Sequence, residues 1–252
     1  MNPKRSRLEP DQLAGIEEKL ERADENILNL GVEINAFIKS SPDAGVANPK
    51  ANRTQQWINA HKDRVIPPRF GVLAGEIAHH WRSCLDHIAW GFSSDDYRRD
   101  NETAIAFPIY LAPPNKKTQP RYDRYIEGIT NPAALKLIAD LQPYKATNPI
   151  DDPLAIIHEL DRVDKHHTLV LVVPGFDAQL IIPKSFLTTK VISAFELDED
   201  SFPSDPTKKA DFKVSRQIAF AAFGQRKNQA VVPSLTHLSH EIRKIIRRFS
   251  VL

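Results

Sequence analysis

DQLAGIEEKLERADENILNLGVEINAFIK, residues 11–39, is the stretch that decides the fold. Its apolar residues recur in alternating steps of three and four, which predicts one continuous face of a long helix. These residues are Leu13, Ile16, Leu20, Ala23, Ile27, Leu30, Ile34 and Phe37. Pro10 suits the first turn of this helix, and Asp11 suits its positive N-terminal end. A helix about 40 Å long needs an equally long partner, either within the chain or in a second copy.

Residues 69–92 predict that partner. Pro67 and Pro68 end whatever precedes them, and a second long apolar stripe follows. The stripe consists of Phe70, Ala74, Ile77, Trp81, Cys84 and Ile88. Two helices of this length with matching stripes favour an antiparallel helical hairpin.

After the second long helix, the sequence predicts an irregular segment and then further helices. Residues 93–130 read as irregular, with one strand expected at Ala104–Tyr110. Asn131 and Asp152, each followed by proline, are typical of helix starts, and they predict helices that end near residues 141 and 167. A last helix is expected at Ser234–Phe249.

Between the last two helices the apolar period changes to that of strands. We expect strands at Leu169–Val173, Gln179–Ile182, Val191–Leu197 and Phe212–Phe223. Helices followed by strands and a final helix favour an α+β fold, with a small antiparallel sheet after the helical hairpin. The expected division is a mainly helical part, residues 1–168, and a sheet part with the C-terminal helix, residues 169–252, packed as one unit.

Composition limits the function classes. The chain has 252 residues, 41% of them hydrophobic, and 34 basic against 32 acidic residues give a net charge of +2. This balance argues against a protein that coats nucleic acid by charge alone. A single cysteine, Cys84, excludes a disulfide framework and a zinc site with several cysteines. Without a long apolar run, we expect a cytoplasmic protein that does not enter a membrane.

Histidines concentrate in two of the predicted helices. Residues 76–87 and 158–167 together hold six of the nine histidines in the chain. Surface helices favour glutamate and lysine instead, and histidine is a weaker helix former. We therefore expect a polar site between these two helices.

Arg82 and His87 are separated by four residues within the predicted hairpin. This R-x4-H spacing resembles the signature of the HEPN superfamily of helical ribonucleases. The resemblance implies that His87 is the general acid and base, and that Arg82 stabilises the scissile phosphate without a metal. Asp86, Asp164 and His166 would orient this pair, and RNA would be the partner.

A metal site is the alternative reading of the same helices. Glu76 with His79, and Asp164 with His167, are carboxylate-x-x-histidine pairs whose members share one helix face. Carboxylate-bridged metal sites in helical bundles use such pairs. This reading predicts a divalent transition metal such as iron or zinc.

A structural network is the third reading, and it predicts a non-catalytic interaction protein. Charged side chains of both helices would then form ion pairs that fix the packing, which buried charges require. These side chains are Arg82, Asp86, Asp161, Arg162, Asp164 and Lys165. The apolar seam of residues 11–39 would suit a homodimer through the long N-terminal helix.

Four separated sequence blocks carry a more specific resemblance. They are HHWRSCLDH at 79–87, FPI at 107–109, LQPY at 141–144 and LDRVDKH at 160–166. In this order the blocks are similar to those of a group of uncharacterised bacterial proteins, which implies that the two polar helices act together. Metal-independent RNA cleavage is our leading functional expectation, ahead of the metal and interaction readings.

Overall fold

The structure, a computed structural model, describes residues 7–40, 65–166, 218–220 and 229–252, together with short strands between 171 and 215. Seven α-helices lie in these described parts. Three are long: α1 (Pro10–Lys39), α3 (Pro68–Phe92) and α8 (Val231–Ser250). Four are shorter: α4 (Asp95–Asp100), α5 (Gln119–Ile126), α6 (Pro132–Asp140) and α7 (Pro153–His166). Two short 3₁₀ helices, Pro143–Lys145 and Pro149–Asp151, connect α6 to α7.

The chain divides into two compact units. The first contains Met1–Leu30, Gly71–Leu169 and Val232–Leu252, and the second contains Gly31–Phe70 and Val170–Val231. In the second unit, Phe37 packs edge-on against Phe70 with ring centroids 5.7 Å apart. Arg69 Nε also pairs there with Glu33 Oε2 at 2.8 Å. Every residue of the candidate site below belongs to the first unit.

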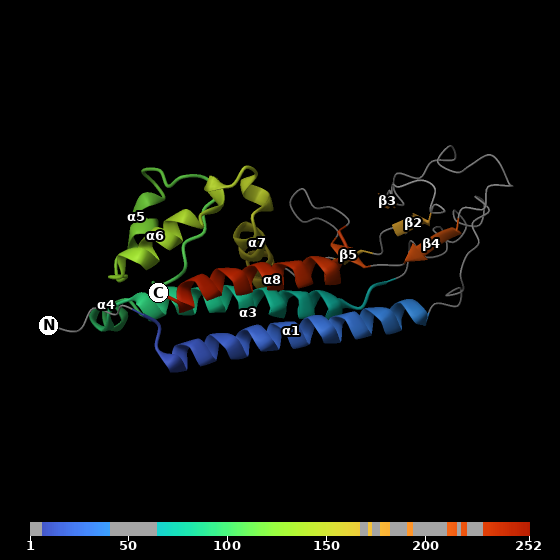
Figure 1. Ribbon diagram of the computed structural model, residues 1–252, viewed down its shortest axis with the longest axis horizontal. Helices are drawn as coiled ribbons and strands as arrows, with labels where there is room; N and C mark the ends of the chain where they lie inside the picture. The colour runs from blue at the N-terminus through green and yellow to red at the C-terminus, as the bar shows by residue number, and fades with distance from the viewer. Residues whose placement is uncertain are drawn as a thin grey trace. The chain divides into compact units, whose positions relative to one another are not determined.

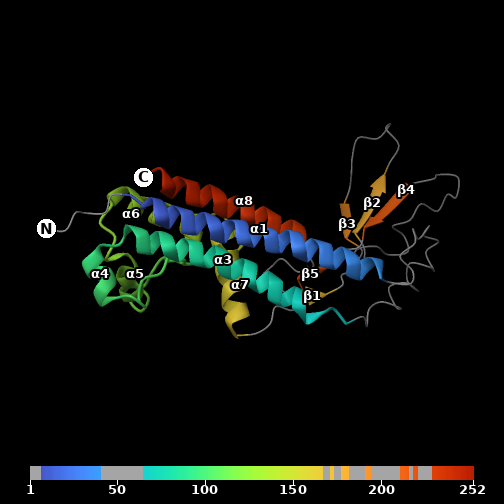
Figure 2. The same cartoon turned by 90° about the horizontal axis from the view of Figure 1, so that it is seen from below.

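The apolar seam of α1 is buried within the chain. Ile16, Leu20, Ala23 and Leu30 are at most 1% exposed. Both cartoon views show α3 and α8 beside α1 and running opposite to it (Figures 1 and 2). The predicted helical hairpin is confirmed, and α8 joins it as a third long helix.

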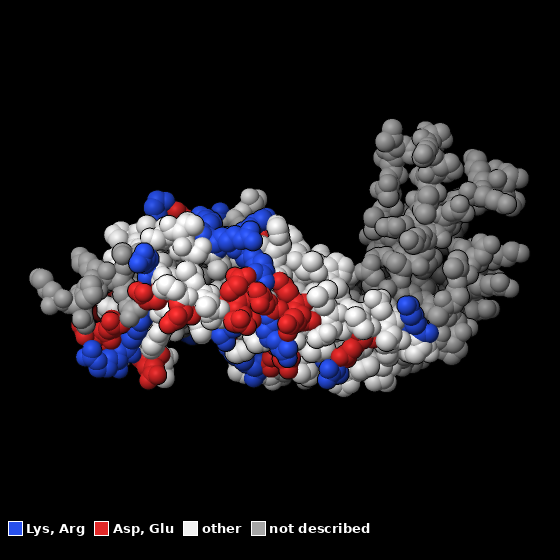
Figure 3. Space-filling view, turned by 60° about the horizontal axis from the view of Figure 1, so that its bottom comes forward, with Lys and Arg blue, Asp and Glu red and all other residues white. Residues whose placement is uncertain are grey.

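Polar contacts tie α8 to α1 along the edge of this packing. Arg243 Nη1 contacts Glu17 Oε1 at 2.6 Å, and Arg243 Nη2 contacts Asp24 Oδ2 at 2.7 Å. Ser239 donates a further hydrogen bond to Asp24. Acidic and basic side chains adjoin one another on the face that Figure 3 shows. This mixing agrees with the balanced composition of the chain.

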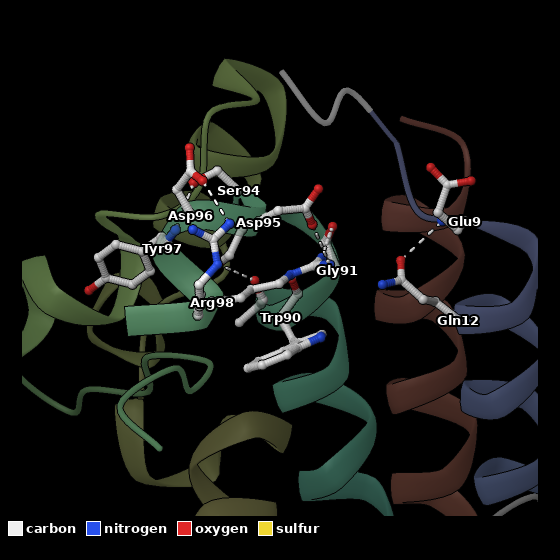
Figure 4. A network of polar contacts seen from close by, with 12 residues as sticks. Glu9, Gln12, Trp90, Gly91, Ser94, Asp95, Asp96, Tyr97 and Arg98 are labelled. Atoms are coloured by element: carbon white, nitrogen blue, oxygen red, sulfur yellow. Dashed lines mark hydrogen bonds and ion pairs between the residues drawn. The ribbon is translucent and has the colours of Figure 1, made fainter. Parts of the chain in front are cut away.

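The C-terminal end of α3 is closed by a side chain from α4. Arg98 Nε donates to Trp90 O at 2.7 Å, and Arg98 Nη2 donates to Gly91 O at 2.8 Å, as Figure 4 shows. The last carbonyls of a helix lack partners within the helix, so a cation is favourable there. The guanidinium also lies over the Trp90 ring, 5.3 Å from its centroid.

The predicted α+β fold class is wrong. The interpretable part of the chain is 73% helix and 2% strand, which makes the fold predominantly helical. The strand segments are short: β1 (Leu171–Val172), β2 (Asp177–Ile181), β3 (Val191–Ser193), β4 (Asp211–Ser215) and β5 (Ala219–Phe220). They pair antiparallel in the orders β1–β5 and β3–β2–β4. Among the described residues these pairings involve only two to five residues each, which is short for strands of a globular sheet.

The strand expected at Ala104–Tyr110 is absent, although the segment is described throughout. Its backbone finds side-chain partners instead of a neighbouring strand. Phe107 N donates to Asp86 Oδ1 at 2.8 Å, and Tyr110 N donates to Gln142 Oε1 at 3.2 Å. Phe107 is nevertheless 1% exposed, so the segment contributes to the core although it forms no strand.

Among the described residues, no helix combines the length and apolarity needed to cross a bilayer.

Candidate functional site at the α3–α7 cluster

Polar side chains of α3 and α7 meet on one side of the first unit. Because both helices also contribute to the apolar core, their polar residues are confined to the remaining faces. We call this set the α3–α7 cluster; it comprises Glu76, His79, Arg82, Asp86, His158, Asp161, Asp164 and Lys165. These residues come from the two segments, 76–87 and 158–167, between which the sequence predicts a polar site, but only His79 and His158 of their six histidines belong to the cluster.

Asp161 is the buried centre of the cluster. Its side chain is 4% exposed, and its two carboxylate oxygens have partners on different helices. Asp161 Oδ1 lies 3.1 Å from His79 Nδ1, and Asp161 Oδ2 lies 2.6 Å from Lys165 Nζ. A buried carboxylate is tolerated only when it is paired in this way.

His79 presents the opposite environment, since its side chain is 59% exposed. An ionised carboxylate can only accept a hydrogen bond, so His79 Nδ1 carries the proton in this contact. The imidazole as a whole remains largely open to solvent. An imidazole oriented by a buried carboxylate is the arrangement that acid–base enzymes use.

Arg82 is buried beside this pair and binds the FPI block. Arg82 Nη2 donates to Phe107 O at 2.9 Å and lies 2.8 Å from Asp86 Oδ1. Burial raises the pKa of the Asp86 carboxyl, while Arg82 and the Phe107 N–H oppose that shift. With its side chain 9% exposed, Arg82 is held inside the protein, where it fixes Phe107 and Asp86.

His87 lies away from Arg82. Five residues turn an α-helix by about 500°, so the two side chains leave α3 about 140° apart. His87 is exposed, and its pKa is lowered by partial burial and then by Lys19 of α1. The R-x4-H pair is therefore not assembled within one chain, and its assignment as a nuclease pair stays a prediction.

His158 adds a second imidazole to the cluster. Desolvation lowers its pKa, and the Arg82 guanidinium lowers it further, while Asp161 acts in the opposite direction. His158 lies one turn before Asp161 on α7, so both project from the same side of that helix. Two imidazoles thus flank the buried carboxylate.

Asp164 packs against the backbone of α3 at Gly75. A Cβ at position 75 would lie 1.8 Å from Asp164 Oδ1, so a larger residue there would push this carboxylate out of its place. Burial and the neighbouring Asp161 raise the pKa of Asp164, which His79 lowers. Gly75 and Asp164 set how closely the two helices approach.

The predicted metal ligands are only partly brought together. Glu76, His79 and Asp164 belong to the cluster, whereas His167 lies outside the described residues. Within the parts of the chain that the structure describes, no group of three or more His, Cys, Asp or Glu side chains is arranged to hold a metal ion. The iron or zinc reading gains no support from these positions.

The network reading describes part of the cluster. Arg82–Asp86 and Asp161–Lys165 are ion pairs, but each lies within one helix, whereas that reading expects pairs between the two helices. Arg162 instead pairs with Glu159 on the exposed side of α7, with Nη2 2.6 Å from Oε1. His166 is the exposed last residue of α7.

The LQPY block joins the same assembly through Gln142, which the sequence analysis did not single out. Its Nε2 donates to Pro108 O at 2.8 Å and to Ile138 O at 3.0 Å. All four sequence blocks are thereby connected: Gln142 holds the FPI segment, Arg82 and Asp86 hold its Phe107, and His79 contacts α7. A glutamine followed by proline, at the end of an expected helix, was the available signal.

Comparisons with protein-family models, with curated proteins and with solved structures find no match to this chain. The resemblances to HEPN ribonucleases and to a group of bacterial proteins therefore stay predictions. Function is inferred here from the geometry of the α3–α7 cluster.

Proposed function

We propose that the α3–α7 cluster cleaves phosphodiester bonds of RNA by general acid–base catalysis without a metal. One observation carries the proposal: the exposed imidazole of His79 is held through Nδ1 by the buried carboxylate of Asp161. Such a contact fixes both the tautomer and the direction of the reactive nitrogen. It assigns the acid–base role to His79 in place of His87.

The cluster contains the groups that this reaction needs. His158, whose lowered pKa keeps it neutral near pH 7, accepts the proton of a ribose 2′-hydroxyl. The resulting oxygen attacks phosphorus, and the bond from phosphorus to the 5′ oxygen of the next nucleotide breaks. In its cationic form His79 donates the Nε2 proton to that leaving oxygen and becomes neutral, with its remaining proton on Nδ1. The products are a 2′,3′-cyclic phosphate and a free 5′-hydroxyl.

Lys165 supplies positive charge near the reacting phosphate. Its side chain is 53% exposed, and the ion pair with Asp161 keeps its ammonium group beside His79. Charge stabilisation by a positioned cation is a large term in phosphoryl transfer. Arg82, Asp86 and Asp164 act as positioning residues, because they join α3 to Phe107 and to α7.

The test is cleavage of a fluorescent single-stranded RNA in EDTA by the wild type and by His79→Ala. Loss of a general acid typically slows a reaction by about 100-fold to 10,000-fold, which sets the expected effect. Because His79→Ala also removes one partner of the buried Asp161 carboxylate, thermal unfolding of the variant is measured alongside, at a temperature where it is fully folded. Equal rates for the two proteins would overturn the proposal.

A further inference from the structure

A second surface of the first unit combines aromatic rings with basic side chains. Four half-buried tyrosines lie on α5 and on the segments beside it: Tyr110, Tyr122, Tyr125 and Tyr144. Exposed basic residues accompany them: Lys116, Lys117, Arg121, Arg124 and Lys145. We call these nine residues the tyrosine surface.

The rings of this surface are close to one another. The Tyr110 and Tyr122 centroids are 5.6 Å apart with an interplanar angle of 67°. The pKa of Tyr122 is raised by burial and then by Tyr144, and the pKa of Tyr110 is raised by burial and then by Tyr125. The phenols therefore stay neutral at physiological pH, and the half-buried rings are held in place by their neighbours.

A positively charged side chain lies over one of these rings. The Arg121 guanidinium lies 5.4 Å from the Tyr125 ring centroid, and Arg121 Nε donates to the Tyr125 hydroxyl at 2.5 Å. Residues 115–127 contain four basic and two acidic side chains. A ligand that fits must therefore be anionic and must also offer flat faces. Single-stranded nucleic acid has both properties, because its bases stack on aromatic rings and its phosphates bind cations.

The tyrosine surface is joined to the α3–α7 cluster by one short backbone segment. Phe107, which Arg82 and Asp86 hold, lies three residues before Tyr110, a span of at most about 10 Å of extended chain. Tyr144 N donates to Tyr110 O at 3.2 Å, and Gln142 holds Tyr110 N, so the connection is fixed at both ends. Both sets of side chains are therefore anchored to the same segment.

We propose that the tyrosine surface binds the single-stranded RNA segment next to the bond that is cleaved. Bases stack on the tyrosines, while Arg121, Lys116 and Lys117 contact phosphates. This inference rests on the proposed function for its choice of RNA. It adds the substrate class, which is unpaired RNA, because a duplex hides the base faces that the rings require.

The experiment measures fluorescence anisotropy of a labelled single-stranded 2′-O-methyl RNA in EDTA, with the full chain. The methyl group removes the attacking hydroxyl, so the strand stays intact whether or not the protein is a nuclease. Tyr122→Ala should weaken binding by about tenfold, and Tyr122→Phe should bind like the wild type. An unlabelled duplex should compete poorly.

A second variant keeps the test sound if Tyr122→Ala fails to fold. Lys116 and Lys117 are exposed, so replacing both by alanine leaves the core intact. The slope of log affinity against log salt should become shallower by about 1.4, since each lost phosphate contact on a single strand contributes about 0.7. Arg22→Ala is the matched control, because this arginine is 60% exposed on α1.

The outcomes separate the two proposals. Binding that needs Tyr122 and the two lysines, without cleavage of natural RNA, supports this inference and removes the proposed function. Cleavage by a protein whose affinity does not change in these variants overturns the inference alone. Preference for the duplex, or no binding by the wild type, also overturns it.

Discussion

At the scale of single residues, Asp161 holds the proposed catalytic side chains in place. It is buried to 4% exposure, yet its partners His79 and Lys165 are both more than half exposed. A carboxylate in this position holds two mobile side chains in one arrangement at the protein surface. It acts through His79, so it is a positioning residue.

Replacing Asp161 with asparagine tests that role. Asparagine keeps the size but loses the charge and can present its NH₂ group to Nδ1, which favours the wrong tautomer. We expect kcat for RNA cleavage to fall at least tenfold and its pH profile to change, with KM little altered. Asp161→Glu should recover part of the pH profile. An unchanged profile with lower stability would show that Asp161 is merely structural.

His80 gives stability a pH dependence. Its pKa is lowered from 6.5, mainly by burial and then by Lys19, and its buried Nδ1 has no hydrogen-bond partner among the described residues. Below the unfolded-state pKa, the unfolded chain therefore binds more protons than the folded chain. The stabilisation is present above pH 6.5 and is lost as the pH falls through the lowered folded-state pKa.

We therefore expect the free energy of unfolding to decrease between about pH 7 and pH 5, with a smaller decrease in His80→Gln. His87 and His158 act in the same direction and remain in the variant. The raised carboxyl pKa values of Asp86, Asp152 and Asp164 act in the opposite direction, and these groups are the same in both proteins. Urea titrations across this range measure the difference, and parallel curves for the two proteins would contradict the assignment.

Cys84 is expected to be inert. The thiol is buried, and burial raises its pKa to about 12, so almost no thiolate forms at pH 8. A thiol reagent should label Cys84 only after the protein is unfolded in denaturant. Rapid labelling of the native protein would show that α1 and α3 separate in solution.

At the scale of elements, one glycine of α3 and one of α1 form a matched pair for testing how tightly the helices pack. A Cβ at Gly91 of α3 would lie 2.2 Å from the side chain of Leu8, which is buried, whereas a Cβ at Gly15 of α1 meets nothing within 4 Å. Gly91→Ala should destabilise the fold by about 1–3 kcal/mol through overpacking. Gly15→Ala should stabilise it by about 0.5–1 kcal/mol through backbone entropy alone. Equal effects of the two changes in thermal unfolding would contradict the packing at Gly91.

The long elements were predictable because their burial is periodic. The α1 seam, the α3 stripe and the helix starts at Asn131 and Asp152 follow from local spacing and capping, and the structure confirms them. The short helices α4 and α5 were missed, because six and eight residues give too few turns to show a period. The α+β class failed because the strands after the helices are only two to five residues long, while helices make up most of the described residues.

The sequence predicted where the candidate site lies better than it predicted which side chains act together. Clustered histidines pointed to α3 and α7, but R-x4-H says nothing about which way each side chain leaves the helix. Burial of Arg82 and exposure of His79 depend on how α7 and Phe107 pack against α3. Backbone partners such as Phe107 O carry no side-chain signature, so only the structure could provide them.

For the whole molecule, the packing of α1 within the chain and its predicted role in a homodimer are separate questions. The α1 seam is used within the chain, because α3 and α8 pack beside it (Figures 1 and 2). A homodimer through α1 stays a prediction, and it would have to use another face, where Leu28 and Val32 are 70% and 68% exposed. The balanced charge of +2 places any RNA affinity in local surfaces rather than in the overall field.

The central claim is that RNA cleavage depends on the His79–Asp161 contact and not on the R-x4-H pair. Single-turnover cleavage in EDTA by His79→Ala and His87→Ala, measured side by side, tests it most directly. We predict a loss of at least about 100-fold for His79→Ala and a rate within a few-fold of wild type for His87→Ala. The reverse order, or no cleavage by the wild type, would contradict the claim.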